Sequence, residues 1–393
     1  MLDRIKKLKK AIKIEQDAEL KRYDSLLREQ TIKEQIAEGV TLYPVEYVNE
    51  RYNTFEDLIL EFNINKNQDP YKFSSNGRVN LFTSNNTDKI EGVVVSFKND
   101  ILSIQITDNE LPDWIKSGKL GLNAVPDTRT SDIQLKTLER IEKGELPLAH
   151  SFYTNGNQQE FSVEQLTFDD FNNSQNDAIS QLISSNPFHI IHGPPGTGKT
   201  KTLVKAILLL VAKGQRILVS APTNTAVDHI TLELIKQNTA VVRVGNSFKI
   251  SEDIIPFSLK AQVLNSPLMD VVKRLKKDSE TIRKKAYKYK RNFGKEDYQE
   301  RKRLRFELRE IRKDIRKMEQ EISVNCITNA KIVTGTFIGL QDKKLAKSDS
   351  AGNGFDAVFV DEAGQAVEPS IWSVAHLAPK LILAGDPLQL PPT

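Results

Sequence analysis

The first 38 residues of the chain carry apolar side chains at helical spacing. Leu2, Ile5 and Leu8 stand three residues apart among lysines, which is typical of one helix face. Gly39 follows as a residue type that commonly ends a helix. The pattern predicts one long helix, a helical stalk over residues 1–39.

Residues 40–130 instead carry short β-type runs. Ile101–Thr107 and, less regularly, Arg78–Thr83 alternate apolar and polar positions, and Lys98–Asp100 has the composition of a hairpin turn. Several short strands with little helix predict a small β-barrel. The helical pattern then returns, so we expect a return helix and linker over 131–165.

From 166 to 393, short apolar runs are mostly separated by helical stretches. The runs are Phe188–Ile191, Arg216–Ser220, Val241–Val244, Ile332–Val333, Ala357–Val360 and Leu381–Ala384. Such runs favour an α/β domain whose parallel sheet is covered by helices on both faces. Between the third and fourth runs, residues 268–322 keep a helical period and predict an inserted helical hairpin.

Composition narrows the class of protein. The charged fraction of 27% is ordinary for a soluble globular protein. The single cysteine, Cys326, excludes a disulfide framework and a cysteine-based zinc cluster. The longest apolar run, Ala206–Ala212, is too short to span a bilayer, and the N-terminus lacks a signal-peptide core. We therefore expect a cytoplasmic protein without a membrane partner.

Charge is distributed unevenly along the chain. Residues 271–320 hold 20 Lys and Arg against 9 Asp and Glu, whereas the remaining chain holds 36 against 43. A basic segment in an otherwise acidic protein indicates a polyanionic partner. A solvated, charged helix is the alternative interpretation.

One motif has the spacing of a phosphate-binding P-loop. It lies between the run Phe188–Ile191 and the helical run Thr202–Ala212, and consists of Gly193, Pro194, Pro195, Gly196, Thr197, Gly198, Lys199 and Thr200. Glycines allow backbone N–H groups to surround phosphates, and a helix N-terminus adds positive potential. Lys199 would reach the β- and γ-phosphates, and the Thr200 hydroxyl would bind Mg²⁺.

Two carboxylates follow the run Ala357–Val360. Asp361, at the end of a strand, would hold Mg²⁺ through Thr200 and water. Glu362 is placed to deprotonate the attacking water. The pair predicts a Walker B site.

The order of the motifs resembles superfamily 1 helicases, especially the branch of the nonsense-mediated-decay RNA helicase, senataxin and the immunoglobulin-mu-binding helicase. The resemblance covers about 165 to 393. Besides the P-loop, it rests on segments similar to the Q motif and to motifs Ia, Ic, II and III: Asn172–Gln175, Ala221–Ala226, Val333–Gly339, Asp361–Ala366 and Gly385–Pro392.

The resemblance implies a RecA-like ATPase domain and roles for matching residues. Gln175 would bind adenine, Gln389 would sense the γ-phosphate with support from Asp386, and Lys201 completes the predicted nucleotide-binding set. Backbone contacts to nucleic acid are implied for Thr223, Asn224 and Thr336. Phosphate contacts are implied for the insertion lysines Lys284, Lys285 and Lys288.

We therefore predict the core of an ATP- and Mg²⁺-dependent helicase that acts on single-stranded RNA or DNA. The resemblance implies a second RecA-like domain in the full-length protein, and the sequence ends directly after motif III, so we expect weak activity from this chain alone. An ATP-switched nucleic-acid-binding module without translocation is the alternative. A GTPase is disfavoured, because no Asn-Lys-x-Asp guanine motif is present.

Overall fold

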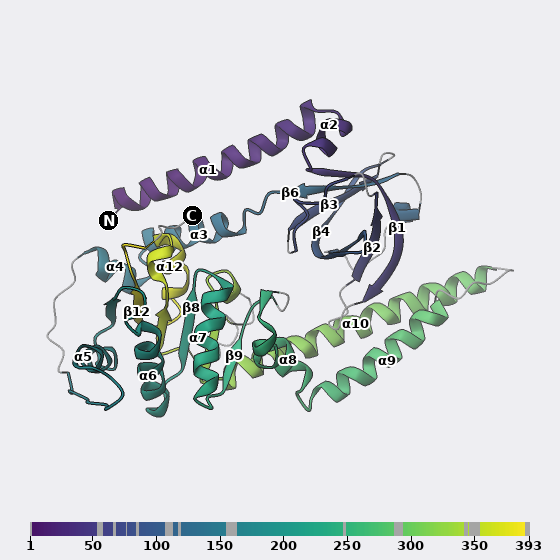
Figure 1. The fold of residues 1–393 in the computed structure, drawn as a ribbon. Coiled ribbons are helices and arrows are strands. Elements are labelled where there is room, and N and C mark those ends of the chain that lie inside the picture. Colours follow the sequence, from purple (N-terminus) through teal and green to yellow (C-terminus); the bar gives the residue numbers. More distant parts are fainter. Residues whose placement is uncertain are drawn as a thin grey trace. The chain divides into compact units, whose positions relative to one another are not determined.

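The computed structural model divides the chain into two compact units (Figure 1). The barrel unit comprises Lys10–Ser131 and Lys302–Arg316; the sheet unit comprises Met1–Lys9, Asp132–Arg301 and Lys317–Thr393. The structure describes residues 2–52, 58–65, 68–75, 77–83, 86–106, 113–116, 119–154, 163–246, 249–286, 294–341, 345 and 354–389. Among these, no helix is long and apolar enough to cross a membrane.

The barrel unit contains a closed, six-stranded antiparallel barrel. Its strand order is β1-β2-β5-β4-β3-β6, and alternating side chains such as Phe62 and Leu81 fill its interior. The strands are β1 (Thr41–Tyr52), β2 (Leu58–Ile64), β3 (Arg78–Thr83), β4 (Asn86–Lys98), β5 (Ile101–Ile106) and β6 (Leu120–Val125), with a 3-10 turn at Asp113–Lys116. The predicted barrel is confirmed.

The predicted hairpin turn joins β4 to β5. Asn99 and Asp100 have φ angles of 51° and 62°, in the left-handed region that Asn and Asp tolerate better than other side chains.

The sequence predicted one continuous N-terminal helix, and this prediction is wrong. The helix breaks near Thr31. Helix α1 spans Leu2–Glu29 and α2 spans Ile32–Ala37. Thr31 caps α2: its hydroxyl accepts a hydrogen bond from the Glu34 backbone N–H, and the Glu34 carboxylate accepts one from the Thr31 backbone N–H. This capping box starts a new helix.

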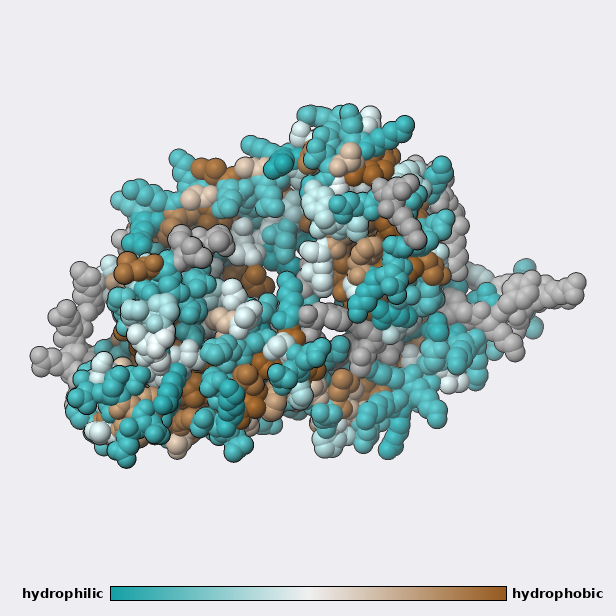
Figure 2. All heavy atoms as spheres, viewed as in Figure 1, coloured by the Kyte–Doolittle hydropathy of each residue, from teal (hydrophilic) through white to brown (hydrophobic). Residues whose placement is uncertain are grey.

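The insertion consists of α9 (Met269–Ala286) and α10 (Lys295–Asn329), so its second helix extends seven residues beyond the expected boundary. Figure 2 shows mostly hydrophilic side chains over these helices. Lys276 Nζ lies 2.7 Å from Glu319 Oε1, which ties the two helices together. Within the barrel unit, the Arg312 guanidinium of α10 stacks 3.9 Å above the Tyr52 ring.

The sheet unit contains six parallel strands in the order β7-β12-β11-β8-β10-β9. They are β7 (Phe188–His192), β8 (Ile217–Ala221), β9 (Val241–Arg243), β10 (Ile332–Thr336), β11 (Ala357–Val360) and β12 (Lys380–Gly385). Every residue of β8 and β11 is buried, as expected for strands covered on both faces. Each of the six apolar runs predicted from the sequence forms one of these strands, so all six predictions are confirmed.

Helices connect and cover these strands. Helices α6 (Lys199–Ala212) and α7 (Asn224–Lys236) pack against one apolar core with β8 and β11, while α12 (Glu368–Ala375) contacts β11. Further helices described in this part of the chain are α3 (Arg129–Glu142), α4 (Pro147–Tyr153), α5 (Asn173–Leu182) and α8 (Leu259–Leu264), with 3-10 turns η3 (Glu252–Phe257), η4 (Gly339–Gln341) and η5 (Ala363–Gln365).

Phe62 offers a test of the barrel core, because its side chain is fully buried. Phe62→Ala should lower the free energy of unfolding of the barrel unit by about 3–5 kcal/mol. Trp114 packs against this core and Trp372 lies in the sheet unit. Urea unfolding followed by Trp114 fluorescence in a Trp372→Phe background would measure the change. Val48→Ala, at an exposed position of β1, is the control. An equal loss of unfolding free energy in both variants would contradict the placement of Phe62 in the barrel core.

Candidate functional site: a phosphate loop and the strand ends beside it

The P-loop connects β7 to α6 through two left-handed glycines. Gly196 and Gly198 have φ angles of 79° and 82°, which strain residues with a side chain. Lys199 Nζ donates hydrogen bonds to the carbonyls of Gly193 (2.6 Å) and Pro194 (3.2 Å). The lysine therefore lies folded over its own loop, beside the N-terminus of α6.

Thr200 and Asp361 meet across the site. The Thr200 hydroxyl lies 3.3 Å from Asp361 Oδ2, and Asp361 Oδ1 accepts a hydrogen bond from the Glu362 backbone N–H. Burial raises the pKa of Asp361, although its hydrogen bonds and Lys199 oppose the shift. A buried carboxylate with a raised pKa is relieved by a bound cation.

These two side chains fit Mg²⁺. Magnesium in nucleotide sites takes one or two protein ligands and completes its shell with phosphate and water. The described residues contain no cluster of three or more His, Cys, Asp or Glu able to hold a metal by themselves. Thr200 and Asp361 thus supply the small donor set expected for a metal that arrives with a nucleotide.

Glu362 has an unusual backbone conformation. Its φ angle is 52°, and Gln365 Nε2 lies 3.3 Å from Glu362 Oε2. A non-glycine residue in the left-handed region is strained and needs support from its surroundings. Here the turn η5 that follows holds the half-buried carboxylate next to Asp361.

The end of β12 packs directly on this turn. A Cβ atom on Gly364 would lie 2.8 Å from the Asp386 carbonyl oxygen, and one on Gly385 would lie 2.8 Å from the Gly364 nitrogen. The Gly193 N–H also donates to the Gly385 carbonyl at 3.4 Å. Backbone therefore meets backbone where the P-loop, the Walker B turn and the motif III segment converge.

Asp386 organises the motif III segment. It accepts hydrogen bonds from the Leu388 backbone N–H (3.0 Å) and from Gln389 Nε2 (3.4 Å). These hydrogen bonds lower the pKa of Asp386, and the one from the Leu388 backbone has the larger effect. His192 Nε2 lies 3.6 Å from Asp386 Oδ1. Sequence reasoning missed His192, because its role depends on the pairing of β7 with β12.

Gln175 lies against the P-loop. Its side-chain oxygen accepts from the Asn172 backbone N–H, and its Nε2 donates to the Thr197 carbonyl at 3.0 Å. The residue predicted to read adenine is thus positioned by the cap of α5 and by the loop itself. Lys201 Nζ donates to the carbonyl of Asp170, two residues before the Asn172 cap, at 3.0 Å.

Three predicted nucleic-acid contacts share one edge of the sheet. Thr336, at the end of β10, is paired with Ala221, two residues before Thr223. The Thr223 hydroxyl caps α7, and the Thr336 hydroxyl accepts from the Gly339 N–H. Asn224 is half-buried and bonds to Arg243 of β9 at 3.0 Å.

Of the three predicted insertion lysines, two lie among the described residues. Lys284 and Lys285 lie on α9, with exposed side chains. Lys288 lies outside the described residues.

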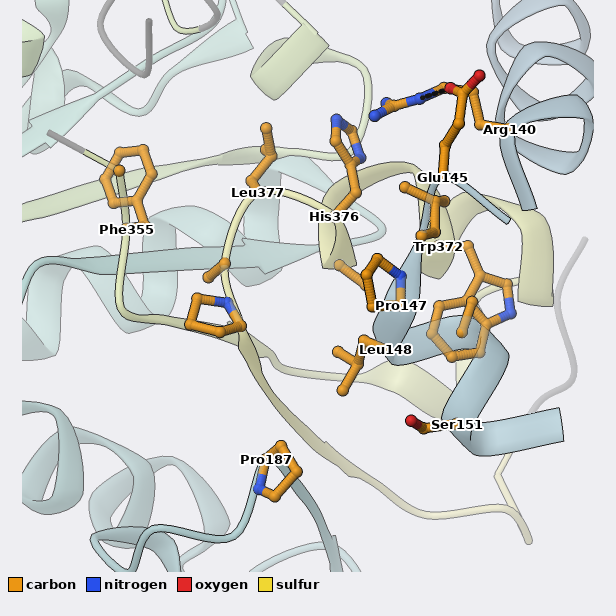
Figure 3. Close-up of a pocket in the computed structure, with 16 residues that line it drawn as sticks. Arg140, Glu145, Pro147, Leu148, Ser151, Pro187, Phe355, Trp372, His376 and Leu377 are labelled. Carbon is orange, nitrogen blue, oxygen red and sulfur yellow. Dashed lines mark hydrogen bonds and ion pairs between the residues drawn. The ribbon is translucent and has the colours of Figure 1, made fainter. Parts of the chain in front are cut away.

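An apolar pocket of about 550 Å³ lies at the opposite edge of the sheet (Figure 3). Pro187 and Phe355, which line it, precede β7 and β11. His376, also in the lining, is neutral at physiological pH, because burial lowers its pKa to about 4. The lining is mainly apolar, and its charged residues Arg140 and Glu145 pair with each other at 3.4 Å. Such a pocket suits phosphates less well than the P-loop edge does.

The fold and this site define a P-loop nucleotide-binding protein with a parallel-sheet core. Residues 170–393 match the family model described as AAA domain, which is more than half of the chain. The chain belongs to this family and is superfamily 1 helicase-like, as its sequence resemblance had indicated.

Named relatives support this assignment. DNA-binding protein SMUBP-2 of Mesocricetus auratus is 36% identical over 220 residues, covering 56% of this chain and 22% of that protein. DNA polymerase alpha-associated DNA helicase A of Schizosaccharomyces pombe is 36% identical over 223 residues, covering 57% and 32%. Probable helicase senataxin of Homo sapiens is 30% identical over 283 residues, covering 57% and 10%. The match thus spans a third or less of each relative.

The raised pKa of Asp361 has a consequence for stability. When a carboxyl group has a higher pKa in the folded state than in the unfolded state, the free energy of unfolding falls as pH rises from the lower pKa to the higher one. The loss persists at every higher pH. Asp361→Asn should therefore raise the melting temperature of the ligand-free protein at pH 7, with the advantage disappearing below about pH 4. Thermal melts across pH would measure this effect.

The same variant should lose the extra thermal stabilisation that Mg²⁺ adds to ATP. Glu362→Gln, which leaves Asp361 intact, is the control and should retain it. Unchanged melting and unchanged Mg²⁺ dependence in Asp361→Asn would contradict the assigned metal site.

Proposed function

We propose that this chain binds ATP with Mg²⁺ and couples its hydrolysis to binding of single-stranded RNA or DNA, as part of a helicase. The 3.3 Å approach of Thr200 to Asp361, beside Lys199, carries the proposal. It joins the two halves of a phosphate-transfer site from segments 161 residues apart. The helicase and DNA-binding names of the relatives support the wider activity.

In the proposed reaction, Lys199 exchanges its loop carbonyls for the β- and γ-phosphate oxygens. Thr200 and Asp361 would hold Mg²⁺, which when bound neutralises phosphate charge. Glu362 orients the attacking water and accepts its proton. Gln389, next to Asp386, senses whether the γ-phosphate is present, and Gln175 favours adenine.

Translocation requires a second RecA-like domain that closes on ATP and contributes arginines, as the family resemblance implies. An arginine finger is worth about 10³–10⁵ in turnover. The cytoplasmic location also stays a prediction.

Lys199→Ala tests the nucleotide site. Losing a charge-assisted hydrogen bond to phosphate should weaken ATP binding about 10- to 100-fold, measured by titration calorimetry. Lys213→Ala removes the same charge at the other end of α6 and is the matched control. Equal affinities in all three proteins, or a preference for GTP in competition, would overturn the proposal.

Turnover should be measured in the same proteins, with and without single-stranded RNA or DNA. Stimulated turnover that Lys199→Ala abolishes would support a coupled motor core. Tight nucleic-acid binding without turnover, even with a second motor domain present, would favour an ATP-switched binding module.

The insertion lysines have a separate signature. Each Lys that neutralises a phosphate contributes about 0.7 to the slope of log affinity against log salt for single strands. The double change Lys284→Ala with Lys285→Ala should therefore weaken oligonucleotide binding and reduce that slope, measured by fluorescence anisotropy. Lys6→Ala with Lys7→Ala, two exposed lysines of α1, is the control. Identical slopes in both double variants would exclude a phosphate contact at Lys284 and Lys285.

A further inference from the structure

A fully buried charge lies behind the sheet edge that carries Asn224. Arg243, in the strand β9, has a relative exposure of 0%. Its Nε donates to Asp228 Oδ1 at 2.9 Å, and a terminal nitrogen donates to the Val244 carbonyl. Asp228 Oδ2 accepts a hydrogen bond from the Ser251 backbone N–H at 2.8 Å. The guanidinium is therefore charge-balanced and held from several sides.

The remaining terminal nitrogen of Arg243, Nη2, points to Asn224. It donates to Asn224 Oδ1 at 3.0 Å. A guanidinium carries only donors, so the Asn224 atom that faces it must be the oxygen. The amide nitrogen, with its two N–H groups, then has to face the other way. The chemistry of Arg243 thus determines the orientation of an amide that sequence alone leaves ambiguous.

Asn224 is well placed to use those two donors. It is the first residue of α7, directly after the exposed cap Thr223. Backbone N–H groups at a helix N-terminus attract phosphate. A neutral amide donor can bind a phosphate oxygen without reading the base.

We propose that Arg243, held by Asp228, is a positioning residue that directs the Asn224 amide N–H groups outward to donate to a phosphate oxygen of the bound strand. This inference rests on the proposed nucleic-acid function of the edge. Arg243 itself does not touch the strand, because it is buried. It acts by keeping the Asn224 oxygen inward.

Asn224→Asp separates this role from a structural one. The inward oxygen of aspartate still accepts from Arg243, now as a charged pair, and a carboxylate at a helix N-terminus is favourable. The melting temperature should therefore stay equal or rise. The outward atom, however, becomes a carboxylate oxygen that repels phosphate, so single-strand affinity should fall at least tenfold. ATP affinity should stay within twofold.

Two further measurements test the mechanism by anisotropy with a labelled single-stranded oligonucleotide. Asn224→Ala should weaken binding by a similar factor at every salt concentration, because a neutral donor releases no counterion. Arg243→Lys keeps the positive charge beside Asp228 but loses the planar guanidinium that reaches Asn224. In the otherwise unchanged chain it should weaken oligonucleotide binding. It should add no further loss to Asn224→Ala.

The outcomes distinguish this inference from the function on which it rests. If the parent chain binds no oligonucleotide, the proposed function and the inference both fail. If Thr336→Val weakens binding while Asn224→Asp binds normally, the function stands and the positioning role is wrong. A lower melting temperature of Asn224→Asp would show that Arg243 does not face the Asn224 oxygen.

Discussion

The nucleotide site depends on backbone segments that meet without side chains between them. Gly364 and Gly385 lie where a Cβ atom would come within 2.8 Å of the neighbouring backbone. Only this close approach lets the Walker B turn sit against the end of β12, with Gly193 bonded to Gly385. The short distance from Thr200 to Asp361 and the support of Gln389 by Asp386 both follow from it.

Sequence patterns predicted the parts of the fold that repeat a simple physical rule. Buried parallel strands need apolar residues on both faces, and all six appeared as such runs. The P-loop and the Asp361–Glu362 pair could be predicted because phosphate chemistry requires particular residues at particular spacing. The break at Thr31 was also encoded, in its capping box with Glu34, but the apolar period around it outweighed that signal.

Other parts of the site could not be predicted, because they depend on which strands are neighbours. His192 approaches Asp386 only since β7 pairs with β12. Arg243 is the one charged residue between the valines of β9, yet its partner Asp228 lies 15 residues away on α7. Nothing in a local pattern links them. Sheet order, rather than composition, brings each pair together.

The nucleotide site and the predicted nucleic-acid contacts follow the carboxyl ends of parallel strands, so they lie at one edge of the sheet and are joined by its ladder. The Asp361 N–H bonds to the Ser220 carbonyl at 2.9 Å, and the Ser220 hydroxyl bonds to the Gly335 carbonyl at 2.9 Å. A hydrogen-bonded path thus runs from Asp361, the proposed metal ligand, to the residue before Thr336. Coupling between the nucleotide site and the nucleic-acid contacts requires an element with two conformational states. Buried strands bonded in this way move together and do not by themselves provide two such states. In the proposed function, a nucleotide-dependent change would therefore have to arise in the loops that the strands carry. Glu362, strained at a positive φ, and the Gln389 side chain, whose hydrogen bond to Asp386 is long at 3.4 Å, are groups there that a phosphate could redirect.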